Sequence, residues 1–272
     1  MRVHVVQVGY GDGERPAERI ARVADLVAGQ RGADLVVLPE LWAPGGFSYR
    51  SWAQHAETID GATFTAIAAA AREIGATVHA GSIVERVPND APPSARHRGP
   101  QGRGLWNTSA VFGPDGELLA TYRKIHRFGF GSGEPVLLEA GTDVVTLPLK
   151  QSEATLGLST CYDIRFPELY RRLLDAGAEV FVVPAAWPLA RVEHWVLLGR
   201  ARAVENQCVV IQCNTAGTHA GVPMGGRSQV VAATGEVLAQ AGAEEEVLTV
   251  DVDLDQVRQW REEFPVLADR RL

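Results

Sequence analysis

Three side chains suited to covalent hydrolysis each follow an apolar run of the sequence. Cys161 follows TLGLST, Glu40 follows LVVLP and Lys124 follows LLATYR. In parallel-sheet proteins the carboxyl ends of the strands border the ligand crevice, where backbone N–H groups or a cation can acidify a thiol. If these strands are neighbours, the three groups could act as nucleophile, base and oxyanion stabiliser.

Each of these residues also has a simpler interpretation when taken alone. An isolated cysteine is usually a small apolar filler, a lone loop carboxylate is usually solvated, and a lone lysine usually lies at the surface. Cys208 and Cys213, in QCVVIQCNT, fit the filler interpretation, and the odd cysteine count without a CxxC pair favours free thiols. The combination of Cys161, Glu40 and Lys124 therefore carries the argument.

The elements that must position these residues alternate between short β-branched runs and amphipathic stretches. This pattern predicts an α/β fold in a single domain over residues 1–272, with enough strands for two sheets. We expect helices over 18–30, 61–75, 166–177 and 194–207. We expect strands over 3–8, 34–39, 76–84, 107–112, 117–122, 144–149, 154–160, 179–184, 208–213, 227–232, 236–240 and 246–252.

Composition excludes several classes of partner. The net charge of -7 leaves no broad cationic surface for nucleic acid. There is no apolar run long enough for a signal peptide or a membrane span, so we expect a cytoplasmic protein without a membrane partner. Two stretches, 86–104 and the Gly-rich 126–135, are predicted loops, and GFGSG at 129–133 lacks the Lys-Ser/Thr of a phosphate loop.

Three motifs together resemble the nitrilase superfamily of carbon–nitrogen hydrolases, in its omega-amidase-like branch. They are PELW around Glu40, YRKIH around Lys124 and STCYDIRFPELYR around Cys161, and VVPAAWP, RARAVENQCVVIQCN and FPVLADRR resemble later segments. The resemblance implies a four-layer α-β-β-α sandwich, a homodimer paired through a helical face, and no metal or organic cofactor. It also implies a second glutamate shortly after the lysine, for which Glu134 fits better than Glu139.

The residues and the resemblance together suggest a mechanism. Glu40 would act as general base on the Cys161 thiol and then as general acid toward departing ammonia. Lys124 and the backbone N–H of Tyr162 would hold the oxyanion, and Glu134 would orient Lys124 or the hydrolytic water. This scheme requires a partly desolvated pocket. Lys124 must lie nearer to the oxyanion than to Glu40, because its charge would otherwise lower the pKa of Glu40.

The substrate is the less constrained part. Phe128, Phe130, Arg165 and Trp187 are candidates for the pocket wall, with packing as an equal alternative, and for Arg165 we favour an ion pair across a subunit interface. The resemblance implies a small amide whose other end carries a carboxylate. The Gly-rich 126–135 and the insertion 86–104 depart from the branch and could reshape the pocket.

Other activities remain open at this point. The same site could act on an N-carbamoyl amine or a nitrile, or the chain could be a non-catalytic interaction module that keeps the fold. A metal hydrolase would need ligands from His79, His126, His194 and His219, but these histidines show no HExxH or paired spacing.

Overall fold

The computed structural model describes residues 1–88, 102–149 and 152–271. One six-stranded sheet is built mostly from the N-terminal half, and its three central strands run parallel. In spatial order its strands are β15 (Glu246–Asp251), β1 (Arg2–Gln7), β3 (Leu35–Val37), β4 (Thr77–Arg86), β5 (Leu105–Phe112) and β6 (Leu118–Arg123).

A second six-stranded sheet comes from the C-terminal half and also has a parallel centre. In spatial order its strands are β14 (Val237–Gln240), β13 (Gln229–Val231), β10 (Val209–Cys213), β9 (Val180–Pro184), β8 (Ala154–Leu158) and β7 (Thr146–Leu149). Each predicted strand therefore exists, with ends displaced by up to a few residues.

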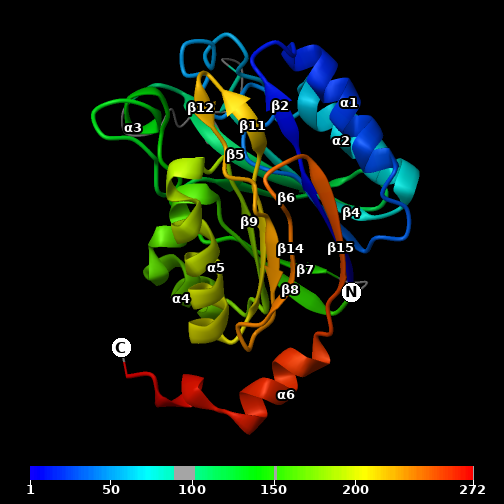
Figure 1. Cartoon of the computed structure of the whole chain (residues 1–272), viewed down its shortest axis with the longest axis vertical. Helices are drawn as coiled ribbons and strands as arrows, with labels where there is room; N and C mark the ends of the chain where they lie inside the picture. The colour runs from blue at the N-terminus through cyan, green and yellow to red at the C-terminus, as the bar shows by residue number, and fades with distance from the viewer. Residues whose placement is uncertain (89–101, 150–151, 272) are drawn as a thin grey trace.

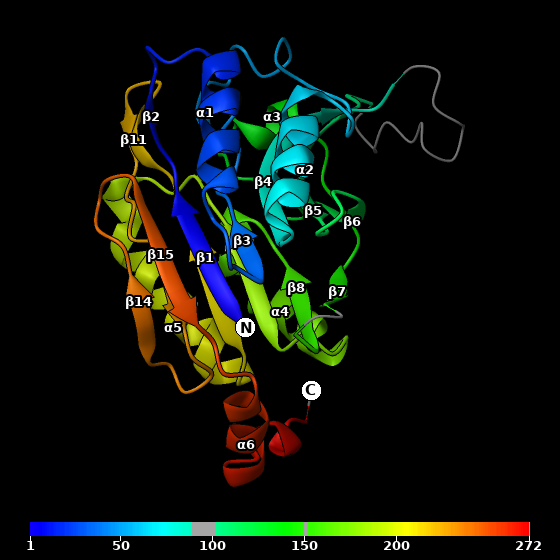
Figure 2. The same cartoon turned by 90° about the vertical axis from the view of Figure 1, so that its right-hand side faces the viewer.

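Two pairs of helices cover the outer faces of the sheets. Helices α1 (Pro16–Ala28) and α2 (Ala62–Ile74) pack outside the first sheet, and α4 (Pro167–Asp175) and α5 (Val192–Asn206) pack outside the second (Figure 1). After a quarter turn, α1 and α2 lie toward the viewer, beside β1, β3 and β4 (Figure 2). The expected four-layer α-β-β-α sandwich is confirmed.

Side-chain alternation along the strands explains the layering. Val3 and Val5 of β1 belong to the core between the sheets, whereas Val6 belongs to the core under α1 and α2. On β9, Val182 faces the other sheet and Phe181 faces the helices. Strands buried on both faces read as continuous apolar runs because every position must be apolar.

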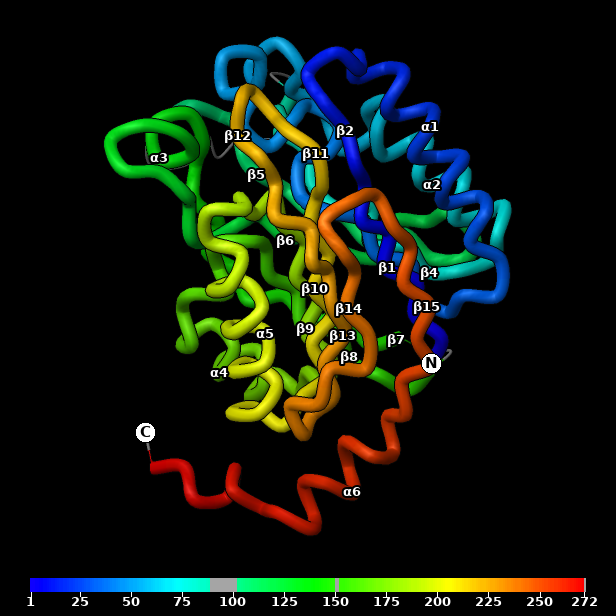
Figure 3. Tube along the Cα trace, in the orientation of Figure 1, coloured from blue at the N-terminus to red at the C-terminus, as the bar shows by residue number. Residues whose placement is uncertain are grey.

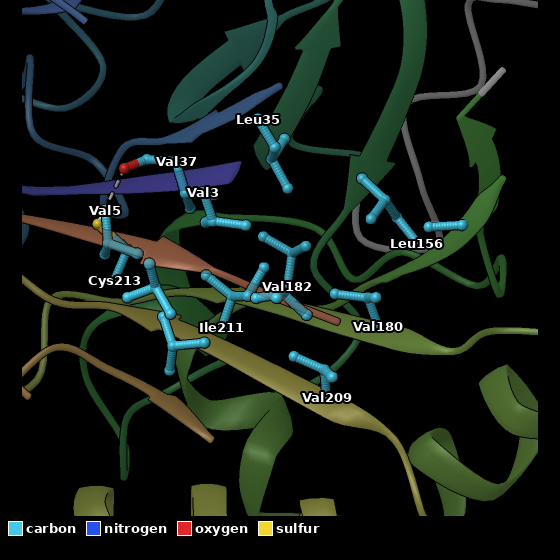
Figure 4. Packing of buried hydrophobic residues seen from close by; sticks show 14 of the residues in the cluster. Val3, Val5, Leu35, Val37, Leu156, Val180, Val182, Val209, Ile211 and Cys213 are labelled. Carbon is cyan, nitrogen blue, oxygen red and sulfur yellow. Dashed lines mark hydrogen bonds between the residues drawn. The ribbon is translucent and has the colours of Figure 1, made fainter. Parts of the chain in front are cut away.

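The core between the sheets is mostly aliphatic (Figure 4). Cys213 is part of it, and its Sγ lies 3.3 Å from the backbone oxygen of Val6 and 3.3 Å from that of Val37, so its one hydrogen can bond to either. These contacts cross from one sheet to the other, which agrees with the interpretation of Cys213 as a buried filler. Burying one such aliphatic side chain contributes about 1.5–3 kcal/mol, so this core holds the two sheets in register.

Several elements were absent from the predictions. A three-stranded sheet joins β2 (Gly9–Gly11), β11 (Ala216–His219) and β12 (Val222–Pro223), and a one-turn helix α3 (Glu134–Leu137) interrupts the end of the predicted 126–135 loop. Helix α6 (Asp255–Glu263) and a final 3-10 turn extend from the body of the molecule (Figure 3).

Two further expectations from the sequence concern the loop 86–104 and a membrane span. Most of the predicted loop 86–104 falls at 89–101, outside the described residues. Among the residues that the structure describes, no helix is long and apolar enough to cross a membrane.

Candidate active site

The structure brings Glu40, Lys124, Glu134 and Cys161 into one buried pocket. Glu40 follows β3, Lys124 follows β6, Glu134 is the first residue of α3, and Cys161 follows β8 at the start of a 3-10 helix, Cys161–Arg165. The side chains are 2–7% exposed, so they lie in the desolvated environment that the sequence-based mechanism required.

Lys124 lies between the two carboxylates. Its Nζ is 2.7 Å from Glu40 Oε1 and 2.8 Å from Glu134 Oε2. Burial acts to lower the pKa of Lys124, but the charges of Glu134 and Glu40 outweigh it and raise this pKa well above its ordinary value. The sequence-based mechanism required Lys124 to lie nearer to the oxyanion than to Glu40. In the structure Lys124 contacts Glu40 directly, because an ammonium buried beside two carboxylates is stabilised by contacting both.

Neutral donors complete this ion cluster. Two carboxylates and one ammonium leave an excess negative charge in a buried place, which is costly unless hydrogen bonds compensate it. Asn107 Nδ2 donates to Glu40 and Glu134, the backbone N–H of Ala186 donates to Glu40 Oε2 at 2.9 Å, and that of Phe128 donates to Glu134 Oε2. Burial is nevertheless the dominant influence on Glu134 and raises its pKa.

Cys161 adopts a conformation that is uncommon for a residue with a side chain. Its φ is 48°, in the left-handed region, which costs about 1–2 kcal/mol and is found mostly where a site requires it. Burial raises the pKa of the Cys161 thiol well above its ordinary value, and the charge of Glu40 and a hydrogen bond with Glu40 act in the same direction. The resting thiol thus keeps its proton next to a carboxylate that can accept it.

Asp163 fixes the turn that carries the nucleophile. Its carboxylate accepts from the backbone N–H of Thr160 at 2.8 Å and from the Tyr122 hydroxyl at 2.7 Å. It also accepts from the backbone N–H of His126 at 2.9 Å and contacts its ring Nδ1 at 2.7 Å. Tyr122 and His126 flank Lys124 in the sequence, so Asp163 links the lysine segment to the cysteine turn.

The pocket mouth is aromatic. Phe128, Tyr162 and Trp187 line it beside Cys161, together with Phe47, which had not been predicted. The space over the thiol is narrow in this structure, about 20 Å³, so only a small group fits beside the sulfur. Phe130, by contrast, is 81% exposed and lines neither part of the pocket, because it lies at the tip of the Gly-rich segment and contacts Phe128 only by its edge.

Two guanidinium groups stand at this mouth. Arg165 lies over the Trp187 ring with its Cζ 4.7 Å from the centroid, and Arg191 lies over the Phe128 ring at 5.4 Å. Burial, and the charge of Arg191 among smaller influences, lower the pKa of Arg165. Within the described parts of the chain, neither arginine forms an ion pair with a carboxylate. The ion pair expected for Arg165 across a subunit interface stays a prediction.

The other candidates lie elsewhere. Glu139 is buried and accepts from the backbone N–H of Arg103 at 2.7 Å, while Glu134 contacts Lys124, so the geometry favours Glu134 as the second glutamate. Among residues 1–88, 102–149 and 152–271, no group of three or more His, Cys, Asp or Glu side chains could hold a metal ion.

The four histidines considered as metal ligands have separate surroundings. Burial lowers the pKa of His79 to about 4 and that of His219 to about 3, and His219 stacks on Tyr10. His126 contacts Asp163, and His194 contacts Arg165.

Comparison with known proteins identifies the family of this chain. The family model for carbon-nitrogen hydrolases matches residues 2–262. The chain belongs to the carbon-nitrogen hydrolase family. It is omega-amidase-like: a 2-oxoglutaramate amidase of Paenarthrobacter nicotinovorans is 48% identical over 271 residues, covering 99% of this chain and 89% of the relative. This family membership makes the protein a hydrolase of carbon–nitrogen bonds other than peptide bonds, as the motifs indicated.

Solved structures support the same assignment. XC1258 from Xanthomonas campestris, a CN-hydrolase superfamily protein with an arsenic adduct in its active site, aligns with a TM-score of 0.87 and 28% identity over 100% of this chain and 97% of that one. A mutant amidase from Nesterenkonia sp. AN1, with acrylamide added to its active-site cysteine, aligns with a TM-score of 0.79 and 26% identity over 97% of this chain and 98% of that one.

Sequence reasoning missed several residues around the site of this carbon-nitrogen hydrolase. Asn107, Tyr49 and Arg191 had no motif to identify them. A signal existed for Asn107, because an amide inside the apolar run LWNTSAVF must be buried and needs a polar partner. Ala186 acts through its backbone N–H, which no side-chain pattern reveals.

Proposed function

We propose that this protein hydrolyses a small ω-amide, with an amide at one end and a carboxylate at the other, to the acid and ammonia. The observation that carries this proposal is the buried cluster in which Glu40 contacts Lys124 and lines the same pocket as Cys161. The similarity to a 2-oxoglutaramate amidase supports the choice of substrate class.

The reaction would proceed in two halves. Glu40 takes the Cys161 proton as Sγ forms a bond to the amide carbon, and Lys124 and the Tyr162 N–H stabilise the oxyanion. Tyr162 is the second residue of its 3-10 helix, so the hydrogen bonds of the helix leave its N–H free. Glu40 then returns the proton to the nitrogen as the C–N bond breaks and ammonia leaves.

Water completes the cycle. Glu40 removes a proton from water as the oxygen attacks the thioester carbon, the C–S bond breaks, and the thiol recovers its proton. Glu134 keeps Lys124 in place throughout, since it lies 2.8 Å from Nζ. No cofactor is required by this scheme.

Alanine at position 161 provides the primary test. Cys161→Ala should abolish ammonia release from ω-amides while leaving the melting temperature within a few degrees of the wild type, and undiminished turnover would contradict the proposal. Assays of N-carbamoyl compounds for carbon dioxide, and of nitriles for consumption, would reveal the two alternative activities. A folded protein inert toward all three classes would instead be an interaction module.

The carboxylate end of the substrate has a test of its own. Arg165 lies at the pocket mouth without an acidic partner in the described chain, and a guanidinium recognises a carboxylate in bidentate fashion. Arg165→Gln should lower kcat/KM for succinamate about 10-fold to 100-fold, the worth of a hydrogen bond to a charged group, and leave butyramide within about twofold. Equal losses for both amides would assign Arg165 to packing on Trp187.

We also propose that two copies pair through α5. Leu197 and Val204 are 64% and 52% exposed and lie seven residues apart, on one face of this helix. A twofold axis would place the same apolar face on both partners. Light scattering should give twice the chain mass of 29.3 kDa, and Leu197→Glu should yield monomers. Location in the cytoplasm stays a prediction.

A further inference from the structure

Asn107 joins the two carboxylates of the site. Its Nδ2 lies 2.8 Å from Glu40 Oε1 and 2.7 Å from Glu134 Oε1, and the side chain is buried on β5. An amide nitrogen carries two hydrogens, so each carboxylate receives one. The opposite amide orientation would direct Oδ1 at two carboxylate oxygens, so the donor assignment is fixed by charge.

The remaining atom of this amide supports a specific role. Asn107 Oδ1 is buried and has no hydrogen-bond partner among the described residues. An unsatisfied buried carbonyl is unfavourable. The side chain therefore leaves its acceptor unsatisfied while both of its donors bind the cluster. Folding stability alone does not explain this arrangement.

The hydrogen-bond donors around Glu40 occupy its two oxygens unequally. A carboxylate oxygen has room for about two donors. Oε1 already accepts from Lys124 at 2.7 Å and from Asn107 at 2.8 Å, whereas Oε2 accepts from the Ala186 N–H at 2.9 Å. The free acceptor position that can receive the Cys161 proton is therefore on Oε2.

We propose that Asn107 is a positioning residue that directs the proton of Cys161 to Oε2 of Glu40 while holding Glu134 against Lys124. The inference rests on the proposed function. When Oε2 takes the proton, Oε1 becomes the carbonyl oxygen of a neutral acid and keeps both of its donors. The same O–H then faces the departing nitrogen, and no side chain has to move between the two transfers.

Loss of Asn107 would leave one acceptor position of Oε1 empty. A proton is then no longer directed to Oε2, and a carboxylate that loses a hydrogen-bond donor takes up a proton more readily. The other groups around the cluster do not interfere near neutral pH. Burial, followed by the charges of Glu134 and Glu40, raises the pKa of Tyr49 to about 12, and the pKa values of Lys124 and Cys161 are raised well above their ordinary values.

The experiment compares pH profiles. Asn107→Leu keeps the branched shape of the side chain and removes both donors, and Asn107→Ala is the second variant if the larger leucine does not fit. Two profiles are measured: kcat/KM for succinamate, and the rate of Cys161 alkylation by iodoacetamide, with Cys161→Ala as the blank. We expect the acid limb of both to move up by about one pH unit or more, the scale of a hydrogen bond to a charged group.

Kinetic constants separate positioning from binding. kcat should fall about tenfold or more with little change in KM, because the lost interaction acts on proton transfer rather than on substrate. The matched control is Thr108→Val, a neighbour on β5 whose hydroxyl donates to Glu85 on the opposite face of the strand. It should lower the melting temperature and leave both profiles in place.

The opposite results would overturn the proposal. If an Asn107 variant keeps the wild-type acid limb and a kcat within twofold while only its melting temperature falls, Asn107 is merely structural. The alkylation profile needs no substrate. If the wild type hydrolyses none of the amides, that profile still decides the role of Asn107, so the two failures are distinguishable.

Discussion

Removing the ammonium of Lys124 should destabilise the protein in a pH-dependent way. Lys124→Met keeps most of the buried volume but leaves Glu40 and Glu134 without their shared cation. Breaking a buried ion pair in this manner costs about 3–5 kcal/mol. The protein can limit this cost by protonating one carboxylate. The free energy of that protonation then sets the size of the stability loss.

The protonation cost follows from the ordinary glutamate pKa of 4.5. At pH 7.5 it is about 4 kcal/mol, since each pH unit above that value costs about 1.4 kcal/mol, and at pH 5.5 it is about 1.4 kcal/mol. The folded variant binds one proton more than the unfolded chain, so its stability falls as the pH rises. The deficit relative to the wild type should therefore shrink by about 1.4 kcal/mol for each unit of acidification.

Urea unfolding followed by tryptophan fluorescence at pH 5.5, 6.5 and 7.5 measures this deficit, at one fixed protein concentration. Lys124→Met/Glu134→Gln is the control, because it removes one orphaned carboxylate and should recover most of the loss at pH 7.5. A deficit below about 1 kcal/mol at pH 7.5, or one that does not change with pH, would refute the electrostatic account of the cluster.

Three further substitutions test the surroundings of the site. Gly81→Ala should cost several kcal/mol and most of the activity, because its φ is +67° and a Cβ would lie 1.9 Å from Pro39 O, next to the catalytic strand end; urea unfolding and ammonia release measure both effects. Tyr10→Phe removes the acceptor of the Gly46 N–H, so we expect about 1 kcal/mol lower stability and a raised KM, and an unchanged KM would show that this loop does not shape the pocket. Phe130→Ala should change kcat/KM less than twofold, since this side chain is 81% exposed; a larger loss would mean that it closes over the substrate.

The strand ends that bear Glu40, Lys124 and Cys161 could be predicted because each follows an apolar run that must be buried. Which strands lie side by side could not be derived from those runs, and the resemblance to a known family supplied it. The position of Lys124 against both carboxylates was missed because a sequence does not show how many charges share one cavity. The mechanism paired Lys124 with Glu134 and kept it nearer to the oxyanion than to Glu40, while in the structure Lys124 contacts both carboxylates.

The elements that were not predicted lack a clear periodic pattern of apolar residues. β2 and β12 are two or three residues long and carry glycine or proline, so they lack the alternation that marks a strand. α6, DQVRQWREE, is highly charged and buries only Val257 completely, so its apolar stripe is too narrow to stand out. These segments are held by tertiary contacts, such as that of Arg261 with the Gln207 carbonyl.

The hydrogen bond from Ala186 to Glu40 has a consequence for folding. Glu40 ends a strand of the first sheet, while Ala186 and Cys161 follow strands of the second, so base and nucleophile meet only after the sheets have docked. A half-folded chain with one complete sheet would contain no working site. Recovery of activity during refolding should therefore lag behind recovery of secondary structure. The delay between the two signals measures how long the two sheets take to dock.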